Sequence, residues 1–133
     1  MALDILIVED EPAILTSLEF ILEHEGWSIR SVTDGEAALT AVQITLPRVV
    51  ILDLMMPKKN GFEVLKTLRN NQATKDLPVL ILTAKGQQQD KQTALELGAN
   101  IFITKPYANT EVIDAVYTLL TDINEKSPRE LSS

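Results

Sequence analysis

The strongest fold signal in this chain is the stretch "RVVILDLMMPKKNGFEVL", from Arg48 to Leu65. Its residues Val49 to Leu52 form a continuous apolar run, which is typical of a strand buried on both faces of a parallel sheet. Asp53 follows at once, without a charged partner beside it in the sequence. A carboxylate at the end of a core strand must be satisfied nearby or used in chemistry. The rest of the chain decides between the two.

The bulk composition indicates one globular domain. The chain has 133 residues, of which 45% are hydrophobic and 23% charged, enough for a substantial core. No apolar run approaches the roughly 20 residues of a membrane-spanning helix. The N-terminal "MALDILIVEDEP" predicts a first strand, not a signal peptide, so we expect a cytoplasmic protein without membrane contact. The absence of cysteine excludes disulfides and thiolate metal sites.

The charge balance argues against direct binding of nucleic acid. Nineteen acidic residues outnumber twelve basic ones, giving a net charge of −7. Contacts to a phosphate backbone need clustered Lys and Arg. We therefore expect no direct nucleic-acid contact by this domain.

Five apolar runs alternate with five helical patterns along the chain. We expect strands at residues 3–9, 27–32, 49–52, 77–84 and 99–104, with a helix after each. This alternation predicts an α/β fold, a doubly wound five-stranded parallel sheet with five helices on its two faces. The domain is expected to span residues 1–123, and the polar residues 124–133 to form a C-terminal tail or the start of a linker.

Polar residues follow four of the expected strands. The first strand ends in Glu9 and Asp10, the third in Asp53, the fourth in Thr83, and the fifth in Lys105. Ligands of open parallel sheets bind beyond the carboxyl ends of the strands. We therefore expect these five side chains to converge at one edge of the sheet.

Their chemistry indicates phosphoryl transfer. Three neighbouring carboxylates repel one another unless a cation joins them, and Mg²⁺ prefers such oxygen ligands. Lys105 supplies a point charge for a phosphoryl oxygen, and Thr83 a hydroxyl donor. A metal and a lysine that neutralise charge while a carboxylate attacks form a complete phosphoryl-transfer site.

In this order and spacing, "VEDE", "LDLMMPKKNGFE", "LTA" and "GANIFITKP" resemble the receiver domain of bacterial two-component response regulators. The resemblance covers residues 3–123. It implies a flavodoxin-like sheet with strand order 2-1-3-4-5. It also implies a regulatory domain, not an enzyme with a separate substrate, that takes a phosphoryl group from a histidine kinase. Mg²⁺ is the implied cofactor, with Mn²⁺ as a substitute.

The resemblance assigns a role to each matching residue. Asp53 corresponds to the phosphoacceptor, and the metal would be held by Glu9, Asp10, Asp53 and the backbone carbonyl of Met55. Thr83 and Lys105 correspond to the groups that bind the phosphoryl oxygens, and Phe102 to an aromatic switch. The resemblance also implies a cis peptide before Pro106 and two side chains that tune the phosphorylated lifetime, Met55 and Lys85. From the residues themselves, we expect Pro57 and Gly61 to shape the loop after Asp53, and Gly61 to supply a positive φ.

The resemblance also implies partners. The phosphoryl donor would be a sensor histidine kinase or a histidine phosphotransfer protein. The surface of the fourth helix, fifth strand and fifth helix would contact an output domain or a docking partner, or form a homodimer. The chain is expected to be a stand-alone regulator or the receiver part of a longer DNA-binding regulator.

Two other functions compete with the phosphorylated switch. A magnesium phosphohydrolase of the haloacid dehalogenase type uses similar residues, but it carries a DxDxT-like motif after its first strand, which is absent here. A docking module that signals without phosphorylation would not need the complete set of site residues.

Overall fold

A computed structural model describes residues 3–56, 60–84 and 87–132 of the chain, with side chains described up to residue 121. A single five-stranded parallel sheet has the order β2-β1-β3-β4-β5, as expected. The strands are β1 (Leu3–Val8), β2 (Ile29–Val32), β3 (Pro47–Leu52), β4 (Val79–Thr83) and β5 (Ile101–Thr104). The helices are α1 (Pro12–His24), α2 (Gly35–Ile44), α3 (Gly61–Arg69), α4 (Gln88–Glu96) and α5 (Asn109–Ser132).

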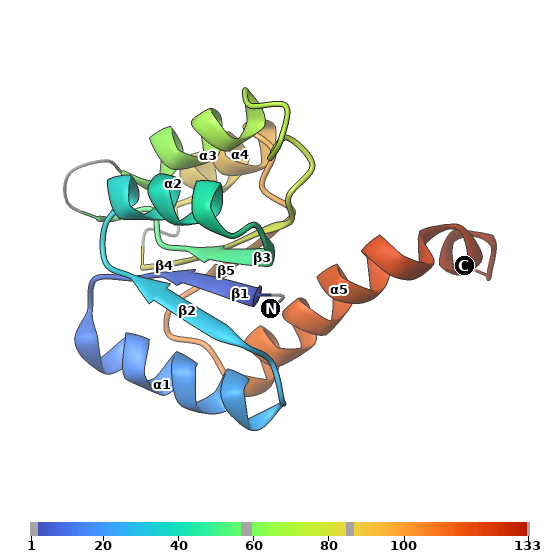
Figure 1. Cartoon of the computed structure of the whole chain (residues 1–133), viewed down its shortest axis with the longest axis horizontal. Coiled ribbons are helices and arrows are strands. Elements are labelled where there is room, and N and C mark those ends of the chain that lie inside the picture. The colour runs from blue at the N-terminus through green and yellow to red at the C-terminus, as the bar shows by residue number, and fades with distance from the viewer. Residues whose placement is uncertain (1–2, 57–59, 85–86, 133) are drawn as a thin grey trace.

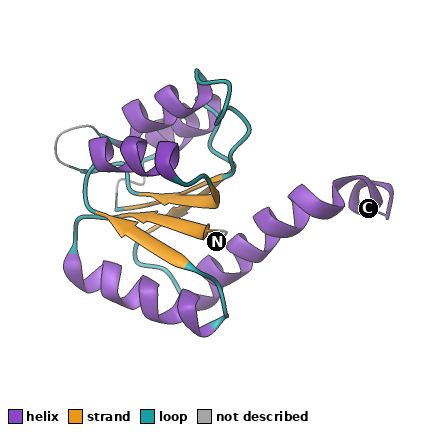
Figure 2. Ribbon diagram, in the orientation of Figure 1, coloured by secondary structure: helices purple, strands orange, loops and turns teal. Residues whose placement is uncertain are grey.

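The sheet lies between two helical layers (Figures 1 and 2), with α1 and α5 on one face and α2, α3 and α4 on the other. Alternate residues of the central strands feed two separate cores, because successive side chains of a strand point to opposite faces. Ile5 and Ile7 of β1 pack toward α1 and α5, whereas Leu6 and Val8 pack toward the other layer. The sheet interior is therefore apolar throughout, and polar side chains gather where the strands end.

Helix ends follow the sequence signals. Gly26 has a φ of +96° and its N–H donates to the Glu23 carbonyl at 2.9 Å, which ends α1 in a left-handed cap. Asn60 begins α3 with a capping box: its side chain accepts from the Glu63 N–H, and the Glu63 side chain accepts from the Asn60 N–H.

Some expected boundaries were wrong by a few residues. β2 begins at Ile29 rather than Trp27, whose ring packs against Tyr117 of α5 with centroids 4.7 Å apart. Pro47 is the first residue of β3 rather than part of the preceding connection, a position where its missing N–H is tolerated.

The backbone of α5 continues to Ser132 and runs past the edge of the sheet (Figure 1). The domain boundary at residue 123 stays a prediction.

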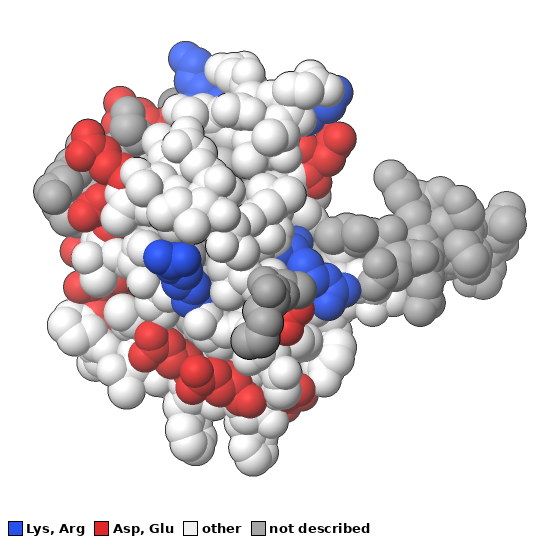
Figure 3. Space-filling view, in the orientation of Figure 1, with Lys and Arg blue, Asp and Glu red and all other residues white. Residues whose placement is uncertain are grey.

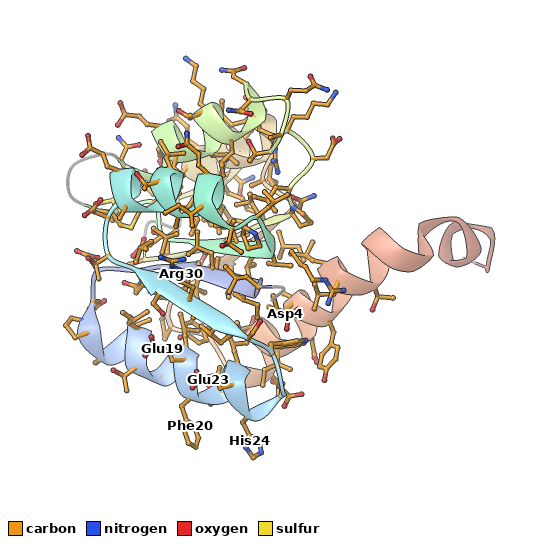
Figure 4. All side chains as sticks on the ribbon, viewed as in Figure 1. Asp4, Glu19, Phe20, Glu23, His24 and Arg30 are labelled. Carbon is orange, nitrogen blue, oxygen red and sulfur yellow. The ribbon has the colours of Figure 1, made fainter. Side chains whose placement is uncertain are left out.

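Charged side chains are unevenly distributed over the face shown in Figure 3. On the face shown in Figure 3, acidic side chains gather along α1, while Lys and Arg are scattered. Figure 4 shows Phe20 and His24 projecting from α1 away from the sheet, so the single histidine of the chain is an exposed surface residue. Among the described helices, none combines the length and the apolar character needed to cross a membrane.

Candidate functional site

Two neighbouring strands bring the acidic residues together. β1 and β3 pair in parallel, with Val8 opposite Leu52, so Glu9 and Asp53 leave the sheet side by side. The Asp53 N–H donates to the Val8 carbonyl at 3.1 Å and extends the pairing by one residue. The apolar runs that precede both acids therefore fix their backbones.

Glu9, Asp10 and Asp53 form one cluster of carboxylates. One oxygen of each lies within 4.8 Å of the others. Glu9 and Asp53 are buried, with 2% and 4% of their surface exposed, whereas Asp10 is exposed. The cluster is thus closed toward the sheet and open toward solvent on the Asp10 side.

Lys105 joins the two buried acids. Its Nζ lies 2.9 Å from Glu9 Oε1 and 3.2 Å from Asp53 Oδ2, and its side chain is only 10% exposed. The peptide bond between Lys105 and Pro106 is cis. Lys105 directly follows β5, which is two strands away from β3 in the sheet. Its ammonium group nevertheless reaches Asp53, the acid that follows β3.

Burial and charge act against each other in this cluster. Desolvation by burial raises the pKa of Glu9, the nearby Asp53 carboxylate adds to the rise, and the hydrogen bond from Lys105 offsets only part of it. For Lys105, burial favours the neutral amine, but hydrogen bonds and the charges of Glu9 and Asp53 outweigh burial and raise its pKa. Lys105 is therefore held as a cation, and its single positive charge does not neutralise both Glu9 and Asp53.

The carboxylates fit a hard divalent cation. Three carboxylates opposite one ammonium leave two negative charges in excess, counted on Glu9, Asp10, Asp53 and Lys105. Mg²⁺ takes carboxylate and carbonyl oxygens and keeps several waters, and the exposed Asp10 leaves room for such waters. The residues present could therefore hold Mg²⁺ without rearrangement of the sheet.

Thr83 and Phe102 lie on the same side of the sheet, facing the layer of α2, α3 and α4. Thr83 is the last residue of β4 and is fully buried. Phe102 of β5 pairs with Ile81 of β4 and is half-buried against the core on that side. Because Ile81 and Thr83 are two residues apart, their side chains point to the same face. A change at Thr83 could therefore be transmitted to Phe102 within one packing layer.

Met55 adjoins the buried carboxylate. Its N–H donates to Asp53 Oδ1 at 3.0 Å, and 55% of its surface is exposed. The role of its carbonyl as a metal ligand stays a prediction. Two further residues of the sequence analysis, Lys85 and Pro57, lie outside the described residues.

Glu11 is a site neighbour that the sequence analysis missed. Its Oε1 lies 4.0 Å from Lys105 Nζ, and its N–H donates to Glu9 Oε2 at 3.1 Å. The available signal was the third acid of "VEDEP", which we interpreted only through the first two. Glu11 thus orients Glu9 through its backbone and adds a weakly held third carboxylate near the lysine.

The expected positive φ of Gly61 was wrong, since among the described glycines only Gly26 and Gly98 have one. Gly61 is required for a different reason. An added Cβ would lie 2.6 Å from the Asp53 carbonyl oxygen and 2.6 Å from Leu54 Cα. Gly61 therefore allows the start of α3 to pack directly on the backbone that follows β3.

We expect Gly61→Ala to lower the free energy of unfolding by about 2 kcal/mol, since a methyl group would push on backbone rather than on a flexible side chain. Because the resemblance to receiver domains makes Asp53 the expected phosphoacceptor, we also expect this variant to slow phosphorylation about tenfold, since the Asp53 backbone must shift. Chemical denaturation and phosphorylation kinetics measure the two effects. The matched control is Gly26→Ala. An added Cβ at Gly26 would have no atom within 4 Å, but the φ of Gly26 is +96°. Gly26→Ala should cost about 1 kcal/mol and leave phosphorylation unchanged, and equal effects of both variants on phosphorylation would contradict the account.

A family model described as the response regulator receiver domain matches residues 5–117. The chain belongs to this family. The membership argues against the phosphohydrolase considered from the sequence, and it makes the chain a regulatory domain of the type that works in two-component signalling.

Curated relatives of this receiver domain are transcriptional regulators. The chain is 41% identical over 116 residues to the alkaline phosphatase synthesis transcriptional regulatory protein PhoP of Bacillus subtilis, covering 87% of this chain and 48% of the relative. It is 33% identical over 131 residues to the phosphate regulon transcriptional regulatory protein PhoB of Escherichia coli, covering 98% of this chain and 57% of the relative. The chain therefore spans about half the length of these relatives.

Solved structures share the fold. The signal receiver domain of a signal transduction histidine kinase from Syntrophus aciditrophicus aligns with a TM-score of 0.85 at 34% identity, over 92% of each chain. The receiver domain of a sensor histidine kinase from Pseudomonas aeruginosa aligns with a TM-score of 0.82 at 25% identity, over 90% of this chain and 98% of that one. The latter structure is described with a magnesium ion coordinated in its active-site cleft.

Proposed function

We propose that this receiver domain is a switch operated by transfer of a phosphoryl group from a phosphohistidine to Asp53. The observation that carries the proposal is the contact of one buried lysine, Lys105, with two buried carboxylates, Glu9 and Asp53. Asp10 completes the acidic cluster. A purely structural ion pair would need one acid for one base, whereas this arrangement has excess negative charge suited to a metal and a phosphoryl group.

Each side chain has a distinct part in the transfer. An Asp53 carboxylate oxygen attacks phosphorus, the bond between phosphorus and the histidine nitrogen breaks, and the nitrogen keeps the electron pair. Lys105 turns its charge toward the new phosphoryl oxygens. Glu9, Asp10, Asp53 and the Met55 carbonyl would hold Mg²⁺, which would supply positive charge to the phosphoryl oxygens. Glu9 and Asp10 carry no nucleophilic role and serve to position the charge.

The response would pass from Thr83 to the output surface. We propose that the Thr83 hydroxyl moves toward the phosphoryl oxygens and that Phe102 fills the space left behind. Phe102 lies on β5, so its shift alters the surface formed by α4, β5 and α5. The amides and acids of α4 make this surface polar, as expected for a partner site rather than a core.

The family and its curated relatives suggest the partners. The phosphoryl donor is a sensor histidine kinase or a histidine phosphotransfer protein. The relatives include a DNA-binding transcriptional regulator from Synechocystis, 42% identical, of which this chain covers 48%. We therefore propose that the output is control of a DNA-binding module through the α4-β5-α5 surface, without nucleic-acid contact by the receiver domain itself.

Acetyl phosphate with Mg²⁺ tests the proposal, because a small acyl phosphate replaces the unidentified kinase. Intact-protein mass spectrometry should show the addition of one phosphoryl group in Mg²⁺ and none in excess EDTA. Repeated release of phosphate from a small phosphomonoester would instead support a hydrolase. No gain of mass in either condition would support a docking module that signals without phosphorylation.

Met55 should prolong the phosphorylated state. Its backbone N–H donates to the Asp53 carboxylate, and its thioether side chain cannot orient an attacking water by donating a hydrogen bond. We expect Met55→Asn to speed phosphate loss about tenfold, because the amide can orient an attacking water by hydrogen bonding. Met55→Leu is the matched control and should keep the parent's lifetime. The decay of phosphorylated protein after removal of acetyl phosphate gives both rates, and an unchanged rate in Met55→Asn would refute the shielding role.

A further inference from the structure

The two ends of α4 are held very differently. At its N-terminal end, Gln87 makes no side-chain cap, and Gln87, Gln88 and Gln89 are all exposed. Ala94 is the one buried residue of this helix. The first half of α4 is therefore joined to the rest of the domain by few apolar contacts, which lowers the cost of displacing it.

Arg69, the last residue of α3, holds the other end. Its Nε and Nη2 donate to the Gly98 carbonyl at 3.1 and 2.8 Å, and Nη2 also donates to Asn100 Oδ1 at 3.2 Å. Its Nη1 donates to the Thr74 carbonyl at 3.2 Å. A guanidinium group directly after the C-terminus of α4 satisfies a carbonyl there and interacts favourably with the helix dipole.

Gly98 is shaped to accept this arginine. It has a φ of +107°, and an added Cβ would lie 2.6 Å from Arg69 Nε. The Gly98 N–H donates to the Leu95 carbonyl and the Ala99 N–H to the Ala94 carbonyl, both at 3.0 Å. The end of α4 and the Arg69 side chain therefore pack so closely that position 98 cannot hold a residue larger than glycine without moving the arginine.

Asn100 connects this arrangement to the sheet. Its Oδ1 accepts from the Val79 N–H at 2.8 Å, and its own N–H donates to the Val79 carbonyl at 2.9 Å. Val79 is the first residue of β4. We call Arg69, Gly98 and Asn100 the Arg69 clamp, which ties α3, the end of α4 and the start of β4 together.

The loosely held end of α4 is the end closest in sequence to Thr83, because β4 ends at Thr83 and α4 begins at Gln88. The Arg69 clamp lies at the opposite end of both β4 and α4. Figure 1 shows α3 and α4 on the same face of the sheet, so a helix fixed at the clamp can tilt without leaving this layer.

We propose that α4 pivots about the Arg69 clamp when the domain is activated, with Arg69 as a positioning residue that makes the helix tilt instead of detach. The inference rests on the proposed function for its trigger, but the clamp itself exists in the unphosphorylated domain. The α3 arginine makes a charged, multidentate contact at one end of α4. At the other end, Gln87 makes no side-chain cap and Gln87, Gln88 and Gln89 are exposed. The helix is therefore a lever with one fixed end. Without the clamp, both ends of α4 should move on activation, instead of the N-terminal end alone.

Amide hydrogen exchange tests the pivot in the whole chain, with beryllofluoride and Mg²⁺ as a phosphoryl mimic. In the parent protein, the mimic should change exchange at Lys91, whose N–H donates to the Gln87 carbonyl. It should leave the N–H groups of Leu97, Gly98 and Ala99 unchanged. An equal change at both ends of α4 would overturn the pivot.

Arg69→Met tests the clamp. Without the mimic, it should speed exchange at Leu97, Gly98 and Ala99 on the order of tenfold, as expected from the loss of hydrogen bonds to a charged group. With the mimic, both ends of α4 should respond. The matched control is Arg48→Met, which removes a surface arginine paired with Asp4 and should leave α4 unchanged. Parent-like protection of all three amides in Arg69→Met would refute the clamp.

Arg69→Lys separates anchoring from a loss of stability and serves if Arg69→Met does not fold. It keeps the charge but loses the planar fork, so exchange at the three amides should fall between the values of the parent and of Arg69→Met. Parent-like exchange in Arg69→Lys would show that the fork is not the anchor. If the mimic changes nothing in the parent protein, the proposed function fails, while the comparison without the mimic still tests the clamp.

Discussion

Asp53→Asn is expected to abolish phosphoryl transfer from acetyl phosphate while the fold is kept. Asparagine has nearly the same shape, and its Oδ1 can still accept the Met55 N–H that Asp53 Oδ1 accepts at 3.0 Å. It lacks a nucleophilic carboxylate. Intact-protein mass spectrometry should show no added phosphoryl group at any time, and thermal unfolding should show one cooperative transition.

Two companion variants interpret this loss. Asp10→Asn removes another acid of the cluster but keeps Asp53 and Lys105, so it should still be phosphorylated, more slowly and with a higher requirement for Mg²⁺. Asp114→Asn changes an exposed acid on α5 and should behave like the parent. Phosphoryl gain by Asp53→Asn at the parent's rate would place the acceptor elsewhere, and complete loss in Asp114→Asn would point to a general defect.

Lys105→Met should have the second largest effect. Lys105 Nζ lies within 3.2 Å of Asp53 and 2.9 Å of Glu9, and methionine fills much of the same volume without the charge. Loss of a cation placed where phosphoryl charge develops should slow phosphorylation on the order of a hundredfold. Lys66→Met, at an exposed position of α3, is the matched control and should keep the parent's rate.

The same variant has a pH signature. Burial already raises the pKa of Glu9, and removal of the Lys105 ammonium should raise it further. A carboxyl whose pKa is higher in the folded state than in the unfolded state costs stability above that raised pKa, and the cost shrinks as the pH falls through it. Lys105→Met should therefore lose about 3 kcal/mol at neutral pH and less in acid.

Chemical denaturation of Lys105→Met and of the parent, from neutral to acidic pH, measures the difference between their free energies of unfolding. Added Mg²⁺ should narrow the difference at neutral pH, because the carboxylates of the variant lack the Lys105 charge and should bind the cation more tightly than those of the parent. A stability difference that is constant with pH, or one that widens in acid, would contradict the assigned role of the lysine.

The sheet and the acidic edge could be predicted because they depend on simple periodicity. The apolar run Val49–Leu52 fixed a buried strand, and parallel strands place their carboxyl ends together. The strand order, which the resemblance to receiver domains implied, then places Glu9, Asp53 and Lys105 at nearby positions of that edge.

Other features could not be predicted because they depend on tertiary approach. Arg69 looks like an ordinary basic residue in the last turn of a helix, and its partners, Gly98 and Asn100, are about thirty residues away in the chain. Gly61 carries no sign of whether it is needed for φ or for close packing. Only the structure shows that a Cβ added at Gly61 would lie 2.6 Å from the Asp53 carbonyl oxygen.

The central claim is that Asp53 itself carries the phosphoryl group. Borohydride reduces an aspartyl phosphate to homoserine, so reduction after treatment with acetyl phosphate and Mg²⁺ marks the acceptor permanently. Peptide mass spectrometry should then find homoserine at position 53 in Mg²⁺, and none there in excess EDTA. Homoserine at Asp10 or at another acid, with Asp53 unchanged, would contradict the account.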